Sequence, residues 1–242
     1  MRLWVQALEA LNTHGKCFAV KLRGIHPKHL VEVPERRWYL DLIKPDDMVL
    51  DVGCGTGTNT LLAATRCKTA IGIDRKTFDT KYDNVGSVGS DITKGLQFKT
   101  GYFSVVLFFD VIEHLEEPDR RYVLKEINRV LKADGLLIVS APNRDTSWRR
   151  RLRAAGLFSY SDPDHRVEYT KAEFLTEITG AGFETVAPVR PIVYDTPLAG
   201  LIDLIGGFSL PLYTRLSRWR HQAAQRRPHE SIGFMVVARP IR

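Results

Sequence analysis

The chain has 242 residues, of which 44% are hydrophobic and 26% are charged, ordinary values for a folded globular domain. They exclude a disordered tail, a collagen-like fibre and a bundle of membrane helices. The length is enough for one domain with a sizeable core, so we expect a single domain over residues 1–242. Three cysteines without CxxC spacing, Cys17, Cys54 and Cys67, exclude a disulfide scaffold and favour a cytoplasmic setting.

The formal net charge of +7 is unevenly distributed along the chain. Residues 144–153 hold five arginines against one aspartate, and residues 215–229 hold five arginines and no acid. A near-neutral body with two arginine clusters does not fit a nucleic-acid-binding surface, so no nucleic acid partner is expected. The clusters indicate contacts with an anionic group or a membrane surface, or else they are solvated helix faces.

From Met48 onward, short apolar runs alternate with helical segments, which predicts an α/β fold with a mostly parallel sheet. We expect residues 1–47 to be a helical segment, 48–142 a cofactor-binding half and 143–242 a substrate half. Thr170 and Glu173 have the spacing of a capping box at the start of a helix. Strands are predicted at 48–52, 69–73, 85–92, 103–109, 136–140, 183–189 and 233–238, and helices at 57–66, 118–132 and 170–179.

An insert at 195–230 separates the last two predicted strands. Its apolar residues recur at helical spacing and are followed by the second arginine cluster. This pattern fits a lid packed over a pocket, whose mouth the first four residues of the 144–153 segment would share. It also fits a helix lying on a membrane surface, with peripheral contact through 198–227.

A glycine turn follows the first predicted strand, with Gly53, Gly55 and Gly57 at alternate positions. Glycine permits a sharp turn and lets backbone N–H groups approach a ligand closely. Thr58 stands where the dinucleotide fingerprint G-x-G-x-x-G needs its third glycine, which argues against an NAD-dependent oxidoreductase. No Gly-Lys-Ser/Thr follows, which excludes the phosphate-binding loop of nucleotide triphosphatases.

Two acids end the next two predicted strands. Asp74 lies 23 residues after Asp51, where a carboxylate can bind the two hydroxyls of a ribose. Asp91 ends the third strand, within reach of an adenine amino group. Either acid alone could be a capping residue, but the glycine turn and both acids in this order favour a nucleoside cofactor.

These segments resemble the class I S-adenosylmethionine-dependent methyltransferases, particularly the quinone-biosynthesis (type 11 methyltransferase domain) family. The matching stretches span residues 45–145 and read VLDVGCGTGTNT, IGIDR, GSDIT, FSVVLFFDVIEHLEEP and LKADGLLIVSAPN. The resemblance continues through EYTKAEFLTEITGAGFE. It implies a Rossmann-like doubly wound sheet of seven strands with the last strand antiparallel. The short link between Asp74 and Asp91 barely accommodates the helix usual there.

The resemblance also implies S-adenosylmethionine as cofactor and S-adenosylhomocysteine as product. The residues implied around the methionine and ribose parts are Asp51, Gly53, Cys54, Gly55, Gly57, Asp74 and Arg75. Asp91 and Ile92 are implied beside the adenine, and Phe109 and Asp110 below the sulfonium.

The candidate catalytic residues are His165, His114 and Tyr169. A histidine can take a proton near neutral pH, and His114 matches a histidine frequent in the family, although a structural role fits it too. His165 is favoured for substrate contact, because its loop should lie over the carboxyl ends of the strands. No metal is expected, because Asp162, Asp164 and His165 are adjacent loop residues without a distant ligand.

The predicted function is methyl transfer to an oxygen or carbon of a small-molecule, quinone or lipid-like acceptor. The alternative is a membrane-surface methyltransferase, or a cofactor-binding module, acting on a polyprenyl-phosphate-linked or other anionic substrate. The Asp-Val-Ile-Glu segment at 110–113 differs from the Asn/Asp-Pro-Pro-Tyr/Phe that holds a base amino group, and no cysteine follows a proline. The chain is expected in the cytoplasm, or peripherally at the inner membrane face.

Overall fold

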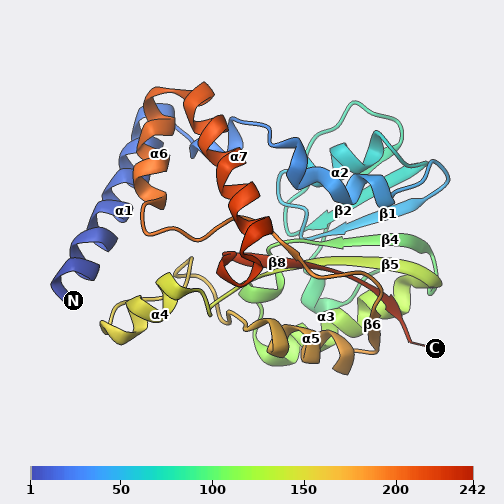
Figure 1. Cartoon of the computed structure of the whole chain (residues 1–242). Coiled ribbons are helices and arrows are strands. Elements are labelled where there is room, and N and C mark those ends of the chain that lie inside the picture. Colours follow the sequence, from blue (N-terminus) through green and yellow to red (C-terminus); the bar gives the residue numbers. More distant parts are fainter. Residues whose placement is uncertain (1, 242) are drawn as a thin grey trace. The chain divides into compact units, whose positions relative to one another are not determined.

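The computed structural model describes residues 2–241, which form two compact units (Figure 1). Unit 1 comprises Met1–Arg37, Asn143–Ser161 and Pro191–Gly233, and unit 2 comprises Trp38–Pro142, Asp162–Arg190 and Phe234–Arg242. The insert predicted at 195–230 and the basic 144–153 segment therefore belong to the same unit. The glycine turn and the acids that follow it belong to the other.

Unit 2 is built on a sheet with the strand order β3-β2-β1-β4-β5-β8-β6. Neighbouring strands from β3 to β5 are parallel, and β8 runs antiparallel to β6, which confirms the predicted α/β sheet. A two-residue strand, β7 (Arg190–Pro191), also pairs with β8 and was not predicted. The strands are β1 (Met48–Val52), β2 (Thr69–Asp74), β3 (Val85–Gly89), β4 (Phe103–Phe108), β5 (Leu131–Pro142), β6 (Phe183–Thr185) and β8 (Gly233–Pro240).

The central strands are buried on both faces, as their continuous apolar sequences predict. One hydrophobic cluster joins the sheet to α3 (Glu117–Val130) and α5 (Lys171–Gly180). A second cluster joins it to α2 (Thr58–Ala64) and to the 3₁₀-helical segment η2 (Pro34–Leu42). Helical layers thus cover both faces and leave the carboxyl ends of the parallel strands to carry loops.

Three local features of unit 2 bear on the predictions. The capping box at α5 is confirmed, since Thr170 and Glu173 each accept a hydrogen bond from the other's backbone N–H. β5 begins at Leu131, directly after α3, because Leu131 pairs with Phe103 before a register shift. The link after Asp74 contains no helix in residues 75–84, in keeping with its short length.

Unit 1 is largely helical, with α1 (Arg2–Arg23), α4 (Ser147–Ala154), α6 (Ala199–Phe208) and α7 (Leu210–Arg226). α1 and α6 touch through glycines, so that a Cβ on Gly200 would lie 2.1 Å from the Asn12 carbonyl oxygen. Gly200 N–H also donates to Asn12 Oδ1 at 2.9 Å. Among the helices of residues 2–241, none is both long enough and apolar enough to cross a bilayer.

Two arginines of the predicted basic clusters have structural roles within unit 1. Asp195 is buried and accepts hydrogen bonds from Thr146 Oγ1 at 2.5 Å and Arg149 Nε at 3.2 Å. Arg220 is buried too, and its guanidinium donates to the Tyr194 carbonyl. Arg149 and Arg220 are therefore not available to a ligand or a membrane, which corrects the view of each cluster as one contact surface.

Candidate functional site

The glycine turn lies at the carboxyl end of β1, and its backbone requires glycine. Gly53, Gly55 and Gly57 have φ values of +74°, +53° and +76°, in the left-handed region. A Cβ on Gly53 would lie 2.4 Å from a Val111 methyl, and one on Gly57 would lie 2.6 Å from the Phe78 ring. A Cβ on Gly55 would meet no atom within 4 Å, so the middle of the turn presents its backbone to open space. This open, side-chain-free turn fits the close approach of a ligand.

Asp51 and Cys54 lie against the turn as part of its support. Asp51 is buried and accepts a hydrogen bond from Thr60 Oγ1 at 2.6 Å, which ties β1 to α2. Burial raises the pKa of Asp51 to about 6. Burial also raises the pKa of the Cys54 thiol to about 12, with Asp51 and Asp74 adding to the effect. Asp51 thus supports the turn through its contact with Thr60.

Asp74 ends β2 beside the turn, at the edge where strands β1 and β2 both finish. Its Oδ2 accepts a hydrogen bond from Gly55 N–H at 2.9 Å, and its Oδ1 accepts one from Arg75 N–H at 2.7 Å. Ionised carboxylate oxygens can accept further bonds, so Asp74 can still bind hydroxyl groups. Arg75 is exposed, and its backbone, not its side chain, supports Asp74.

Asp91 follows β3 and caps the short 3₁₀-helix η3 (Ile92–Lys94). Its carboxylate accepts bonds from the backbone N–H and the hydroxyl of Thr93, and these bonds hold the pKa of Asp91 below its usual range. Ile92 is buried in the core of unit 2. Asp91 is therefore a capping residue, which is one of the roles expected from its position. Its carboxylate stays exposed at the same edge of the sheet.

Asp110 follows β4 in a strained conformation. Among residues 2–241 it is the non-glycine residue with positive φ, at +55°. The Ser140 hydroxyl accepts from Asp110 N–H at 3.0 Å and donates to Asp110 Oδ1 at 2.9 Å. Strain of this kind persists where surrounding contacts enforce it, and it concentrates at functional sites. Phe109 stacks edge-on against Tyr39, with ring centroids 5.0 Å apart.

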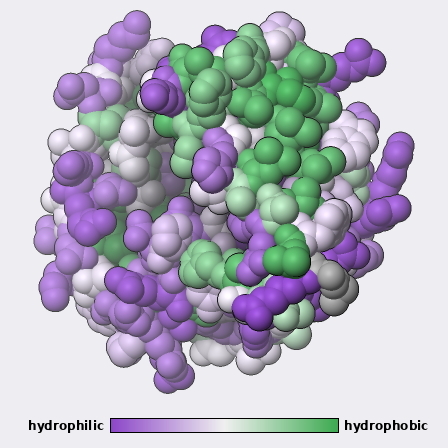
Figure 2. Space-filling view, turned by 90° about the vertical axis from the view of Figure 1, so that its left-hand side faces the viewer, coloured by the Kyte–Doolittle hydropathy of each residue, from purple (hydrophilic) through white to green (hydrophobic). Residues whose placement is uncertain are grey.

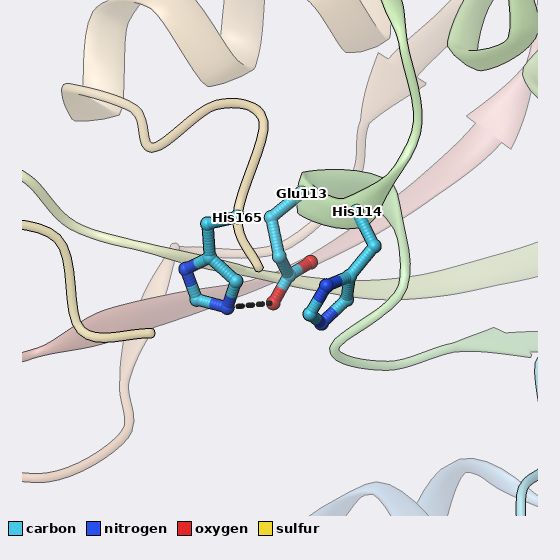
Figure 3. Close-up of side chains that lie close together, drawn as sticks. All are labelled: Glu113, His114 and His165. Atoms are coloured by element: carbon cyan, nitrogen blue, oxygen red, sulfur yellow. Dashed lines mark ion pairs between the residues drawn. The ribbon is translucent and has the colours of Figure 1, made fainter. Parts of the chain in front are cut away.

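Glu113, His114 and His165 point toward one another (Figure 3). Glu113 and His114 lie on the 3₁₀-helix η4 (Ile112–His114), and His165 lies on a loop 51 residues further along the chain. The Glu113 carbonyl accepts bonds from the N–H groups of Arg166 and Val167, which attach this loop to η4. The two imidazole rings lie 4.8 Å apart. The fold therefore unites the two histidines that the sequence singled out separately.

The third catalytic candidate, Tyr169, is a core residue. Its ring is only 3% exposed, belongs to the main hydrophobic cluster and packs against Phe174. Burial raises the pKa of Tyr169 far above its usual range. The side chain therefore packs in the core, which removes Tyr169 as a candidate base.

Sequence reasoning missed two acids of this site. Glu113 is buried, and burial raises its pKa to about 8, with Asp110, Glu168 and Asp162 raising it further. Glu168 is buried as well and lies 2.8 Å from His165 Nδ1. Glu113 adjoins His114 in sequence and was available as a signal, whereas the contact of Glu168 with His165 emerges only from the loop conformation.

Comparison with known proteins gives a consistent result. A methyltransferase-domain family matches residues 29–187. A protein of Mycolicibacterium smegmatis, named "Probable S-adenosylmethionine-dependent methyltransferase", is 32% identical over 163 residues, which are 66% of this chain and 60% of that protein. The 2-methyl-6-phytyl-1,4-hydroquinone methyltransferase of Synechocystis is 30% identical over 183 residues, 67% of this chain and 57% of that enzyme. The chain spans between about half and three-fifths of the length of the curated relatives it matches.

Solved structures share the fold at low sequence identity. The 1,6-didemethyltoxoflavin-N1-methyltransferase of Burkholderia thailandensis, solved with bound 1,6-didemethyltoxoflavin and S-adenosylhomocysteine, superposes with a TM-score of 0.56 at 14% identity. The match covers 86% of this chain and 78% of that one.

Proposed function

The chain belongs to the class I S-adenosylmethionine-dependent methyltransferases, and from this we propose that it transfers the methyl group of S-adenosylmethionine to a small-molecule acceptor. The observation that carries the proposal is the edge of unit 2 where the open glycine turn, Asp74 and the strained Asp110 follow β1, β2 and β4. In open α/β sheets, ligands bind at the carboxyl ends of the strands.

Methyl transfer depends more on alignment of the acceptor with the methyl group than on activation of that methyl group. An electron pair of the acceptor forms a bond to the methyl carbon while the carbon–sulfur bond breaks. Both electrons of that bond stay on sulfur, and the positively charged sulfonium becomes the neutral thioether of S-adenosylhomocysteine. The protein contributes by orienting the acceptor and excluding water, and an acceptor hydroxyl must also lose its proton.

We propose a phenol- or hydroquinone-type acceptor with an apolar chain, methylated at oxygen or carbon. The support is the 30% identity to a methyltransferase named for a phytyl-substituted hydroquinone. The cluster of Glu113, His114 and His165 offers polar groups that such a hydroxyl can contact.

Isothermal titration with S-adenosylhomocysteine tests the cofactor site. We expect wild-type binding in the micromolar range, about −8 kcal/mol. Asp74→Ala should weaken it at least tenfold, because the carboxylate that would hold the ribose is lost. Asp79→Ala, which removes an exposed carboxylate of the following loop, is the matched control and should bind like the wild type.

Absence of binding to the folded wild type would overturn the proposal. A co-purified cofactor would also prevent binding in the titration. Mass spectrometry of the denatured protein must therefore show that no cofactor is present.

A second proposal concerns where the enzyme works: we propose that unit 1 docks peripherally on an anionic lipid surface. The charge of the chain is concentrated there, because unit 1 holds 17 Lys and Arg against 7 Asp and Glu, a formal +10, whereas unit 2 is at −3. Unit 1 also carries exposed hydrophobic side chains, and Figure 2 shows a face of the molecule on which hydrophobic residues gather. Those on α1 are Leu3, Trp4, Leu11, Phe18 and Leu22, and those on α6 are Leu201 and Phe208.

The two helices present these side chains together, since the rings of Phe18 and Phe208 lie 6.2 Å apart. Trp4, Leu11 and Phe18 recur every seven residues, which places them along one stripe of α1. Arg2, Lys16 and Lys21 are exposed on the same helix. An apolar stripe accompanied by basic residues is the composition of an interfacial helix.

Co-sedimentation with anionic and neutral vesicles tests this docking. The wild type should bind anionic vesicles, with loss at high salt because screening weakens the attraction. The double variant Phe18→Ser/Phe208→Ser should lose most of the binding, whereas Tyr82→Ser/Tyr122→Ser, which removes two exposed aromatic rings of unit 2, should not. Equal sedimentation of both double variants would refute docking through this face.

A further inference from the structure

The two histidines beside Glu113 are held in a defined orientation by acceptors on their other ring nitrogen. His165 Nδ1 lies 2.8 Å from Glu168 Oε1, and His114 Nδ1 lies 3.3 Å from the Asp164 carbonyl oxygen. A carbonyl or an ionised carboxylate only accepts hydrogen bonds, so both contacts place the ring proton on Nδ1. In a neutral ring of this tautomer, the lone pair is on Nε2.

The contact of His165 with Glu168 is the arrangement typical of a metal-binding histidine. Such histidines donate their second N–H to a carboxylate or a carbonyl, which fixes the tautomer and raises the basicity of the ligating nitrogen. His165 Nε2 faces Glu113, with 4.0 Å between this nitrogen and Glu113 Oε1 (Figure 3). Ligand atoms from Glu113, His114 and His165 all lie within 4.8 Å of one another.

The carboxylate of Glu113 is only partly compensated within the described chain, where His165 Nε2 lies 4.0 Å from its Oε1. Its Oε2 is buried and has no hydrogen-bond partner among residues 2–241. A buried carboxylate with one unpartnered oxygen beside two imidazole rings is an environment that a cation would stabilise.

We propose that Glu113, His114 and His165 bind a divalent first-row transition-metal ion. Two imidazole nitrogens and one carboxylate oxygen suit Mn²⁺, Fe²⁺, Co²⁺ or Zn²⁺ better than Ca²⁺ or Mg²⁺, which prefer oxygen ligands. Ligand atoms bound at about 2.0–2.2 Å lie closer together than these do. Binding therefore draws the three side chains inward.

The adjacent-loop set of Asp162, Asp164 and His165 lacked a distant ligand, which is why the sequence predicted no metal. Glu113 and His114 supply that distant contribution. They lie on η4 at the end of β4, and His114 is exposed, so a solvent ion and an acceptor can reach the cluster.

The role of the ion rests on the proposed methyltransferase function. A divalent cation lowers the pKa of a coordinated hydroxyl group. The acceptor hydroxyl then binds as its oxyanion and releases its proton to solvent. That oxyanion forms the new oxygen–methyl bond as the carbon–sulfur bond breaks toward sulfur, which assigns the acceptor to the class of phenols or other acidic hydroxyl compounds.

Cobalt binding tests the site directly, with no need for turnover. Protein made without a polyhistidine tag is stripped with a chelator and titrated with Co²⁺, and visible absorption reports nitrogen coordination. We expect about one equivalent bound. Glu113→Gln and His165→Gln should each lower the affinity at least tenfold, and Glu168→Gln about 10- to 100-fold through the orientation of His165.

Glu116→Gln is the matched control, because it makes the same change at an exposed glutamate three residues away. It should bind Co²⁺ like the wild type. Failure of the stripped wild type to bind Co²⁺, or equal binding by all four variants, would overturn the site.

S-adenosylhomocysteine titration of the same samples keeps the two proposals separate. Binding of Co²⁺ without binding of S-adenosylhomocysteine would support the metal site and contradict the methyltransferase proposal. Binding of S-adenosylhomocysteine without binding of Co²⁺ would contradict only the metal site.

Discussion

Asp110 is a strained residue at the edge of the sheet where the candidate site lies. Most side chains avoid φ near +55°, and Asp110 is held there by the paired hydrogen bonds with Ser140 on the neighbouring strand β5. The strain costs of the order of 1–3 kcal/mol. The contacts that enforce it direct the chain after β4 into η4 and so place Glu113 and His114.

At the same scale, Asp51 makes the stability of the protein depend on pH. Burial raises its pKa to about 6 from an ordinary 3.8, so the folded state holds a proton that the unfolded chain has already lost. This contribution to stability is complete below about pH 4 and is lost as the pH rises through 6. The shift corresponds to roughly 3 kcal/mol.

We therefore expect Asp51→Asn to remove the loss of stability that accompanies rising pH. The asparagine keeps an oxygen that accepts a hydrogen bond from Thr60. Measured by urea unfolding from acid to neutral pH, the variant should gain stability relative to the wild type by about 3 kcal/mol. Asp46→Asn, at an exposed aspartate, is the control and should follow the wild type. Parallel curves for Asp51→Asn and the wild type would contradict the assignment.

At the scale of elements, the pairing of α1 with α6 depends on an absence of side chains. A Cβ on Gly15 would lie 2.3 Å from the Gly200 carbonyl oxygen, and the reciprocal approach of Gly200 to Asn12 is closer still. Backbone atoms cannot move aside as flexible side chains can. The exposed apolar residues of the two helices are brought together by this contact.

Gly200→Ala should therefore lower the free energy of unfolding by about 1–3 kcal/mol or more, because the helices must separate to admit the methyl group. Gly180→Ala is the matched control at a helical glycine where a Cβ would meet nothing within 4 Å. That variant should be neutral or slightly stabilising, given the better helix propensity of alanine. Thermal unfolding measures both, and equal effects would show that the helices tolerate separation.

At the scale of the whole molecule, each unit has its own hydrophobic cluster. The sheet carries two large clusters in unit 2, whereas unit 1 has a small one at Val5, Trp148, Leu152 and Ala155. The residues proposed to bind the cofactor all belong to unit 2. Cofactor binding should stabilise that unit selectively.

Hydrogen exchange with and without S-adenosylhomocysteine tests this expectation. A ligand at 100 times its Kd stabilises the form it binds by about 2.7 kcal/mol. We expect slower exchange in β1, β2 and the glycine turn, and unchanged exchange in α1 and α6. Equal protection of both units would contradict the assignment of the cofactor site to unit 2 alone.

The sequence by itself determined the approximate positions of seven strands, the glycine turn and the positions of Asp74 and Asp110 at strand ends. Apolar periodicity and the need for glycine at positive φ are local properties, so neighbouring residues reveal them. The capping box at Thr170 is equally local. For the same reason, the family could be identified from short stretches between residues 45 and 145.

Only the tertiary structure decided which side chains share an environment. It joined Glu113 and His114 to His165 and Glu168, engaged Arg149 and Arg220 in structural contacts, and placed Tyr169 in the core. Each outcome depends on segments distant in sequence that the fold brings together. Burial and partnership are properties of those contacts, and no local pattern of residue types contains them.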